Sequence, residues 1–183
     1  EELYGIEAKR NLDRGYQRAC GIVIWAVRHV FVEGKFGVSQ FTSVMAHPSD
    51  KAYRAIMACI AYMEQRSARG IKFSADGNQV PYGSFDASNK PNPENGLCQI
   101  GCVLTMMNGP IACASKRAHH VGLSSEHNEY MAMCETGKHV VWLRQLLGEL
   151  GMRHMIAEPT VVYGGNYSAL NLSTEDFVST GNQ

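Results

Sequence analysis

The chain has 183 residues, 45% of them hydrophobic, and its 17 basic and 17 acidic residues give a formal net charge of zero. This length suits one ordinary domain or two small ones, and the apolar fraction argues against a wholly disordered chain. The neutral balance argues against a protein that holds nucleic acid by charge alone, and no apolar run reaches the roughly 20 residues of a membrane span.

Apolar periodicity predicts helices in the first part of the chain. Tyr16 to Phe31 repeats apolar side chains at helical spacing, Val38 to Met45 forms a second short helical face, and a third helix runs from Tyr53 to near Gly70. Pro48 ends one element and Ser49 is placed to cap the next. The chain begins without Met and without a signal-peptide layout, so we expect a fragment or a processed piece.

The turn-rich segment Ser74–Asn78 predicts a boundary between a helical segment at 1–74 and a second domain at 79–183. Beyond it the apolar period changes to two, which is typical of strands. Strands are expected over Val80–Phe85, over Cys98–Met106 and from Ile111 onward. Asn108-Gly109 between the last two predicts a tight hairpin turn.

A long helix is predicted over Glu126–Leu150, closed by Gly151. A fourth strand, Thr160–Tyr163, and a further helix from Tyr167 to Leu172 follow it. The predicted order is therefore strand, strand, strand, helix, strand, helix, and the chain shows no internal repeat.

The six cysteines do not have the spacing of a disulfide scaffold, so we expect reduced thiols in an intracellular, reducing compartment. Cys98 and Cys102 lie four residues apart on one face of a predicted strand. The strand rise separates them by roughly 13 Å, too far for two sulfurs to bind one zinc ion. His119-His120 is interpreted as a solvent-exposed pair.

Two acids stand where a metal ion could be held over the edge of the sheet. Asp86 lies on the first predicted strand, and Glu129 lies near the start of the long helix. A third acid would be expected after the fourth strand, but Gly164-Gly165 stands there. Without further information, Asp86 could equally cap a turn, and Glu129 could be an ordinary acid near a helix N-terminus, where the helix dipole favours it.

Short motifs occur in the order typical of the Pol polyproteins of copia-type retrotransposons. They are Phe85-Asp86-Ala87-Ser88, Ile111-Ala112-Cys113-Ala114-Ser115-Lys116-Arg117, Val121-Gly122-Leu123-Ser124-Ser125, Glu129-Tyr130-Met131-Ala132, Trp142-Leu143-Arg144 and Val162-Tyr163-Gly164-Gly165-Asn166. Tyr16–Gly21, Met45–Pro48 and Gly70–Ser74 fit the family's preceding segment. The chain thus resembles the part of Pol in which the reverse-transcriptase thumb leads into ribonuclease H.

This resemblance implies an α+β fold with a ribonuclease H-like mixed sheet of three antiparallel strands and one parallel strand. The sheet is expected to be truncated at its C-terminal side and preceded by a small helical, thumb-like segment. The family holds two Mg²⁺ ions with four carboxylates and cleaves RNA–DNA hybrids. Asp86 matches the first acid, Glu129 the second and Gly165 the third, while the fourth would lie beyond Gln183.

Three functions remain open from the sequence. The first is a catalytically inactive module that acts as a structural or protein-binding subunit, with other protein chains at the sheet edge near Thr160–Tyr163. The second is an active RNA–DNA hybrid ribonuclease with Mg²⁺, its missing acids replaced by Glu175 or Asp176 or by residues outside this chain. The third is a nucleic-acid binder without chemistry, in which Lys116-Arg117 and His119-His120 contact the phosphate backbone.

Overall fold

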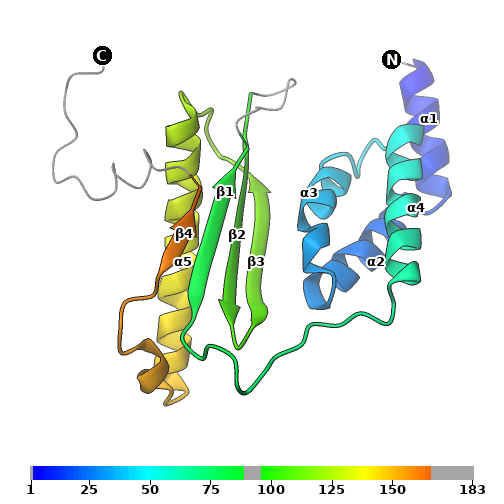
Figure 1. Ribbon diagram of the computed structural model, residues 1–183. Coiled ribbons are helices and arrows are strands. Elements are labelled where there is room, and N and C mark those ends of the chain that lie inside the picture. Colours follow the sequence, from blue (N-terminus) through cyan, green and yellow to red (C-terminus); the bar gives the residue numbers. More distant parts are fainter. Residues whose placement is uncertain (1, 89–95, 166–183) are drawn as a thin grey trace. The chain divides into compact units, whose positions relative to one another are not determined.

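A computed structural model describes residues 2–88 and 96–165 of the chain (Figure 1). The chain divides into two compact units, Glu1–Ile71 and Lys72–Gln183. The division falls just before the turn-rich segment at 74–78, where the apolar period of the sequence changes. Within the two described ranges, no helix has both the length and the apolar character that a membrane crossing requires.

The first unit consists of helices that pack around α2. The bounds are α1 Glu2–Asp13, α2 Tyr16–His29, the short 3-10 turn η1 Val32–Gly34, α3 Lys35–Ser43 and α4 Asp50–Gln65. Tyr16, Val23 and Val27 of α2 are buried together with Ile56 of α4. Apolar periodicity predicts three of these helices, whereas α1 is an addition and α4 ends at Gln65, before Gly70.

Polar contacts hold α1 against the start of α4. The side-chain amide of Asn11 is completely buried, and it donates to the Pro48 carbonyl at 3.1 Å and to the Asp50 carboxylate at 2.9 Å. Ser49 caps α4 as predicted, because its hydroxyl accepts the N–H of Ala52 at 3.2 Å. The position of α1 therefore depends on specific partners in addition to apolar spacing.

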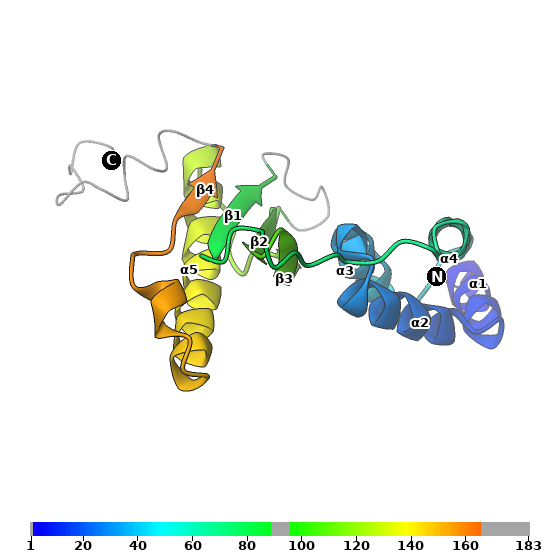
Figure 2. The same ribbon diagram turned by 60° about the horizontal axis from the view of Figure 1, so that its bottom comes forward.

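The second unit contains a four-stranded sheet. Its strands are β1 Tyr82–Ala87, β2 Gln99–Met106, β3 Gly109–Arg117 and β4 Val162–Gly164, in the spatial order β3-β2-β1-β4 (Figure 2). β1 and β3 both pair antiparallel with β2, while β4 lies parallel to β1. This is the mixed sheet expected of a ribonuclease H-like α+β fold, so the predicted fold class is confirmed.

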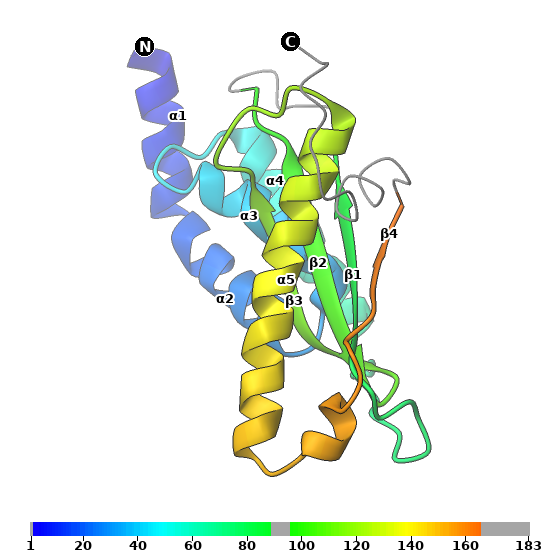
Figure 3. The same cartoon turned by 90° about the vertical axis from the view of Figure 1, so that its left-hand side faces the viewer.

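Helix α5, Ser125–Glu149, covers one face of this sheet (Figure 3). Leu104 of β2 is fully buried against Val140 and Leu143 of the helix. Nearer the start of α5, Phe85 of β1 and Ala132 belong to a second buried cluster. These two clusters fix the helix along the sheet, with its first turns beside the carboxyl end of β1.

The hairpin between β2 and β3 turns one residue earlier than the sequence predicts. Met107 and Asn108 occupy the turn with φ angles of 53° and 63°, and Gly109 is already the first residue of β3. A Cβ at Gly109 would lie 2.6 Å from the half-exposed ring of Phe73, so a larger residue there would displace this ring. The Asn-Gly pair is thus a correct hairpin signal, but the turn is formed by Met107-Asn108 and not by Asn108-Gly109.

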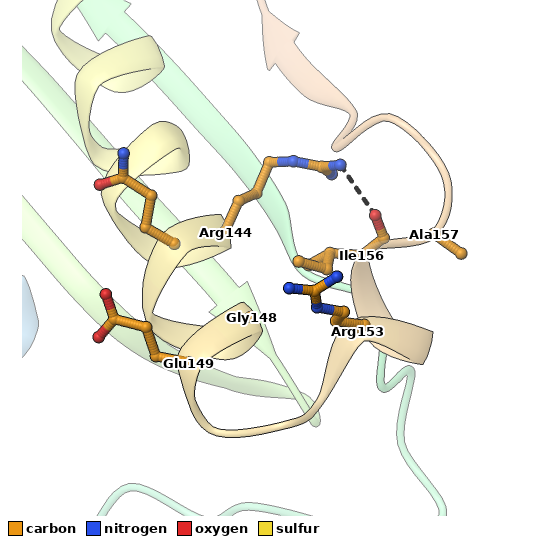
Figure 4. Close-up of a pocket in the computed structure, with 7 residues that line it drawn as sticks. Arg144, Gly148, Glu149, Arg153, Ile156 and Ala157 are labelled. Carbon is orange, nitrogen blue, oxygen red and sulfur yellow. Dashed lines mark hydrogen bonds between the residues drawn. The ribbon is translucent and has the colours of Figure 1, made fainter.

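The fourth strand starts at Val162 rather than at the predicted Thr160. Arg144 of α5 holds the preceding connection, as Figure 4 shows for its bond to the Ile156 carbonyl. The same guanidinium donates to the Glu158 carbonyl at 2.8 Å and to the Thr160 hydroxyl at 3.1 Å. These bonds tie Thr160 to the helix, before the chain enters the sheet. The predicted helix at 167–172 lies outside the described residues.

Candidate functional site

Asp86 lies near the carboxyl end of β1, between the buried residues Phe85 and Ala87. Asp86 itself is exposed, although the residues on either side of it are packed. The Asp86 carboxylate is thereby accessible to a ligand, while its backbone pairs with Gly101 of β2.

Glu129 is presented by the second turn of α5. The helix begins at Ser124, whose hydroxyl accepts the N–H of His127 at 3.1 Å. The Glu129 carboxyl is only 5% exposed and lies near the Asp86 carboxyl and the backbone of Ala87. Burial raises the pKa of Glu129, and the neighbouring charge of Asp86 raises it further. The structure therefore brings the two acids singled out by the sequence into contact.

Two buried oxygens near the start of α5 have no hydrogen-bond partner among the described residues. They are Oε2 of Glu129 and Oδ1 of Asn128. Asn128 is packed tightly, because a Cβ at Gly122 would lie 1.6 Å from this Oδ1. Buried polar groups are normally paired, so two unpaired ones side by side in the sequence indicate a candidate binding site. Sequence reasoning missed Asn128, since a single asparagine in a helix carries no distinctive spacing.

Gly165 occupies the place where the resemblance implies a third acid. Phe85 pairs with Gly164, so Asp86 and Gly165 are the next residues along the two parallel strands. A Cβ at Gly165 would meet no atom of the described residues within 4 Å, whereas a Cβ at Gly164 would lie 2.2 Å from the Phe85 ring. The place has room for a side chain and lacks one.

The donors among the described residues do not by themselves make up a two-ion magnesium centre. Within the described part of the chain, no three His, Cys, Asp or Glu side chains come together as a possible metal group. Mg²⁺ requires near-octahedral oxygen coordination, and a carboxylate pair supplies few of the ligands that two ions need. Glu175 and Asp176, the predicted substitutes, lie outside the described residues.

The basic residues considered for nucleic-acid contact are not equivalent in the structure. Lys116 points toward α5, where its ammonium group lies 2.7 Å from a carboxylate oxygen of Glu135. Lys138 pairs with the same acid at 2.6 Å, and the two lysines lower the pKa of Glu135 to about 2. Arg117 and His119-His120 are exposed. Lys116 is therefore already ion-paired within the second unit.

All six cysteines are free thiols. Cys98 and Cys102 are buried, and burial raises the pKa of each thiol. A buried thiol with a raised pKa stays protonated and behaves as a small apolar side chain. This agrees with the interpretation of the pair as core residues.

The chain is similar to several retrotransposon polyproteins. It is 27% identical over 169 residues, or 92% of its length, to the retrovirus-related Pol polyprotein from transposon TNT 1-94 of Nicotiana tabacum. It is 26% identical over 138 residues, or 75% of its length, to the corresponding polyprotein from transposon RE2 of Arabidopsis thaliana. The aligned regions make up only 12% and 9% of those polyproteins.

A different kind of relative is secreted RxLR effector protein 161 of Plasmopara viticola. It is 28% identical over 106 residues, which are 58% of this chain and 72% of the effector. No protein-family model matches the chain, and no solved structure does. The polyprotein matches extend over both units, and they agree with the order of motifs in the sequence. This chain is related to the Pol polyproteins of copia-type retrotransposons and corresponds to a short segment of them.

Proposed function

We propose that this chain is a retrotransposon-derived ribonuclease H-like module that lacks hydrolytic activity and serves as a structural or protein-binding subunit of a larger assembly. The observation that carries the proposal is Gly165, which has no side chain and follows β4 beside Asp86 in the parallel register. Two-metal hydrolysis uses one ion to generate hydroxide and the other to stabilise the leaving oxygen. Without the third carboxylate, the ions lose a ligand at the centre of the site.

The contrast between packing and acid site supports the proposal. Leu104 is fully buried beneath α5, and Gly164 approaches the Phe85 ring so closely that no Cβ would fit. At the acid pair, by contrast, a Cβ at Gly165 would have open space. The sequence therefore maintains the fold around a site whose ligand set is incomplete.

The similarity to the effector protein also supports a role outside a polyprotein. The matched region makes up most of that relative's length, so a module of this kind can form the greater part of a separate protein. We extend this to the present chain as a module that acts through contacts rather than through hydrolysis.

The edge of the sheet at β4 is the surface we propose for a partner chain. In the described sheet β4 pairs only with β1, which leaves its other side as an edge. Val161 and Tyr163 are 53% and 58% exposed there. An unpaired strand edge is a template for a further strand, so we expect another protein chain near 160–163.

A cleavage assay tests the loss of activity. The chain is incubated with a labelled RNA–DNA hybrid and Mg²⁺ or Mn²⁺, and we expect no product above the metal-only control. Asp86→Asn is the matched variant, because it removes a charge from an exposed carboxyl. Metal-dependent cleavage by the natural chain that Asp86→Asn abolishes would overturn the proposal.

A gain-of-ligand variant tests the role of Gly165 directly. Gly165→Asp places a carboxylate where a Cβ meets no neighbour, and Gly165→Asn places a neutral side chain of the same shape. We expect Mn²⁺ to broaden the Ala87 amide resonance at lower concentration in Gly165→Asp than in Gly165→Asn. Equal broadening in the two variants would mean that the glycine is not the missing ligand.

An active hybrid ribonuclease with Mg²⁺ as cofactor is the second candidate, because Asp86 and Glu129 keep the contact that the enzyme family needs. The cleavage assay decides between the two. Nucleic-acid binding without chemistry is less favoured, since Lys116 is already paired with Glu135. It would require hybrid binding that weakens steeply with added salt.

A further inference from the structure

The acid pair lies at the end of a strand that is itself a sheet edge. β4 ends at Gly164, and the next residue, Gly165, stands beside Asp86 in the parallel register. A strand added to the free side of β4 would therefore pass Gly165 as it left the sheet. Its residue opposite Gly165 would project on the same face as the Asp86 side chain.

The acid pair has no basic partner in the described part of the chain. The ion pairs found there join Arg10 to Asp50 and two lysines to Glu135, away from Asp86 and Glu129. Glu129 is nine-tenths buried, yet its Oε2 lacks a donor. A buried carboxylate without a donor is costly, and a cationic donor that reached it would remove that cost.

Among the described residues, no side chain at Gly165 stands between an added strand and the acid pair. Two strand spacings, roughly 10 Å, separate such a strand from β1, and this is within the combined reach of an arginine and the Asp86 side chain. A guanidinium offers several N–H donors in a fixed plane and can bond both carboxylates at once. A lysine ammonium lacks this planar fork.

We propose that the free edge of β4 binds an extended segment of a partner protein that carries an arginine opposite Gly165, and that this arginine occupies the acid pair of Asp86 and Glu129. The inference rests on the proposed function, because it assigns to the pair a side-chain cation in place of the metal ions. The backbone of the segment supplies affinity along β4, and the arginine sets its register.

The test uses two blocked heptapeptides of alternating threonine and valine. One carries a central arginine, and the other carries citrulline, which has nearly the same shape without the charge. Binding to the full ¹⁵N-labelled chain is followed through backbone amide shifts. We expect the arginine peptide to bind at least about tenfold more tightly, with the largest shifts at Gly165, Tyr163 and Ala87.

Variants distinguish recognition of the arginine by the acid pair from general electrostatic attraction between the peptide and the chain. Asp86→Asn and Glu129→Gln should each reduce the preference for arginine over citrulline to near unity. Glu149→Gln, an exposed acid at the other end of α5, should leave the preference unchanged. The amide spectrum of each variant establishes that the second unit is folded, and the two peptides compared on the natural chain test the proposal without any variant.

Equal binding of the two peptides, no binding, or shifts confined to residues outside β4 and the acid pair would each overturn the inference. The inference would also be overturned if millimolar Mg²⁺ displaced the arginine peptide and shifted the same amide resonances. The acid pair would then be a metal site. The hybrid-cleavage assay is independent of these outcomes. A peptide failure without cleavage refutes only the inference, whereas cleavage refutes the proposed function.

Discussion

Asn11 in the first unit and Glu129 in the second are both buried polar side chains, but their surroundings differ. Asn11 donates to two partners at the start of α4. Glu129 keeps one oxygen unpaired, and all the buried unpaired side-chain atoms found in the described residues belong to Asn128 and Glu129. An unpaired buried polar group costs about 1–3 kcal/mol, so the second unit carries a local cost that the first does not.

The difference is confined to one end of the second unit. Thr136, farther along α5, is fully buried and donates to the Ala132 carbonyl at 2.9 Å. Arg144, two turns beyond, bonds two carbonyls and a hydroxyl. Stability alone therefore explains these polar groups of the first unit and of the rest of α5, whereas the start of α5 retains buried oxygens that have no partner among the described residues. Four predictions can break or sharpen this contrast.

The largest effect is expected where the second unit is packed most tightly. Gly164→Ala places a Cβ 2.2 Å from the Phe85 ring, so β4 must move away from β1. We expect a loss of about 2–3 kcal/mol in the free energy of unfolding of the second unit, the upper part of the range for overpacked cores. Urea titration followed through Trp142 in a Trp25→Phe background measures it.

Gly165→Ala is the matched control, since its Cβ meets nothing within 4 Å. It should change the free energy of unfolding by less than about 0.5 kcal/mol. Comparable losses in the free energy of unfolding of the two variants would mean that both glycines at the end of β4 are tightly packed. There would then be no space for a side chain beside Asp86.

The next effect concerns the satisfied polar group of the first unit. Asn11→Ala removes the donor to Pro48 and Asp50 and leaves the buried Pro48 carbonyl and the partly exposed Asp50 carboxylate with fewer partners. We expect a loss of about 2 kcal/mol in the first unit, measured through Trp25 in a Trp142→Phe background. Arg14→Ala, which removes a more peripheral side chain of the same segment, should cost less. An unchanged urea midpoint of unfolding for Asn11→Ala would remove the basis of the contrast between the units.

Regular spacing explains which parts of the fold the sequence predicts. Val23 and Val27 on α2, and Ile100, Cys102 and Leu104 on β2, recur at helical and strand periods because each element buries one face. The start of β4 was misplaced because Arg144 bonds the chain around Thr160, and such a long-range contact leaves no local pattern. α1 was missed since buried Asn11 fastens it, and an asparagine gives no apolar signal.

The residues of the candidate site also divide into those that the sequence predicts and those that it does not. Asp86 and Glu129 were found through their places in ordered motifs, and the structure puts them in contact. Asn128 was not found, because its significance comes from close packing against Gly122. The edge position of β4 beside the pair depends on strand order, which a sequence specifies only through the complete set of strand pairings.

A third prediction uses pH to compare two acids of α5. The lysines around Glu135 lower its pKa to about 2, so this acid stabilises the unit above its unfolded pKa near 4.5 and loses that contribution as the pH falls toward 2. Glu135→Gln should cost about 1–2 kcal/mol at pH 7, allowing for solvent around the partly exposed lysines. The variant's loss should shrink below pH 4. A loss that is independent of pH would show that packing, not the ion pairs, determines it.

The smallest effect is expected at Glu129, and its sign is opposite. Burial and Asp86 raise the Glu129 pKa, so ionisation opposes folding, and the stabilisation by the protonated form is lost as the pH rises from 4.5 through the raised pKa. Glutamine keeps an oxygen for the Ala87 backbone and an N–H for Asp86 without the charge. Glu129→Gln should therefore stabilise the second unit at pH 7, by at most about 1 kcal/mol, and the gain should vanish at pH 4. Destabilisation at pH 7 of the size expected for Asn11→Ala would mean that the carboxylate has a stabilising partner, and that the two units pair their buried polar groups in the same way.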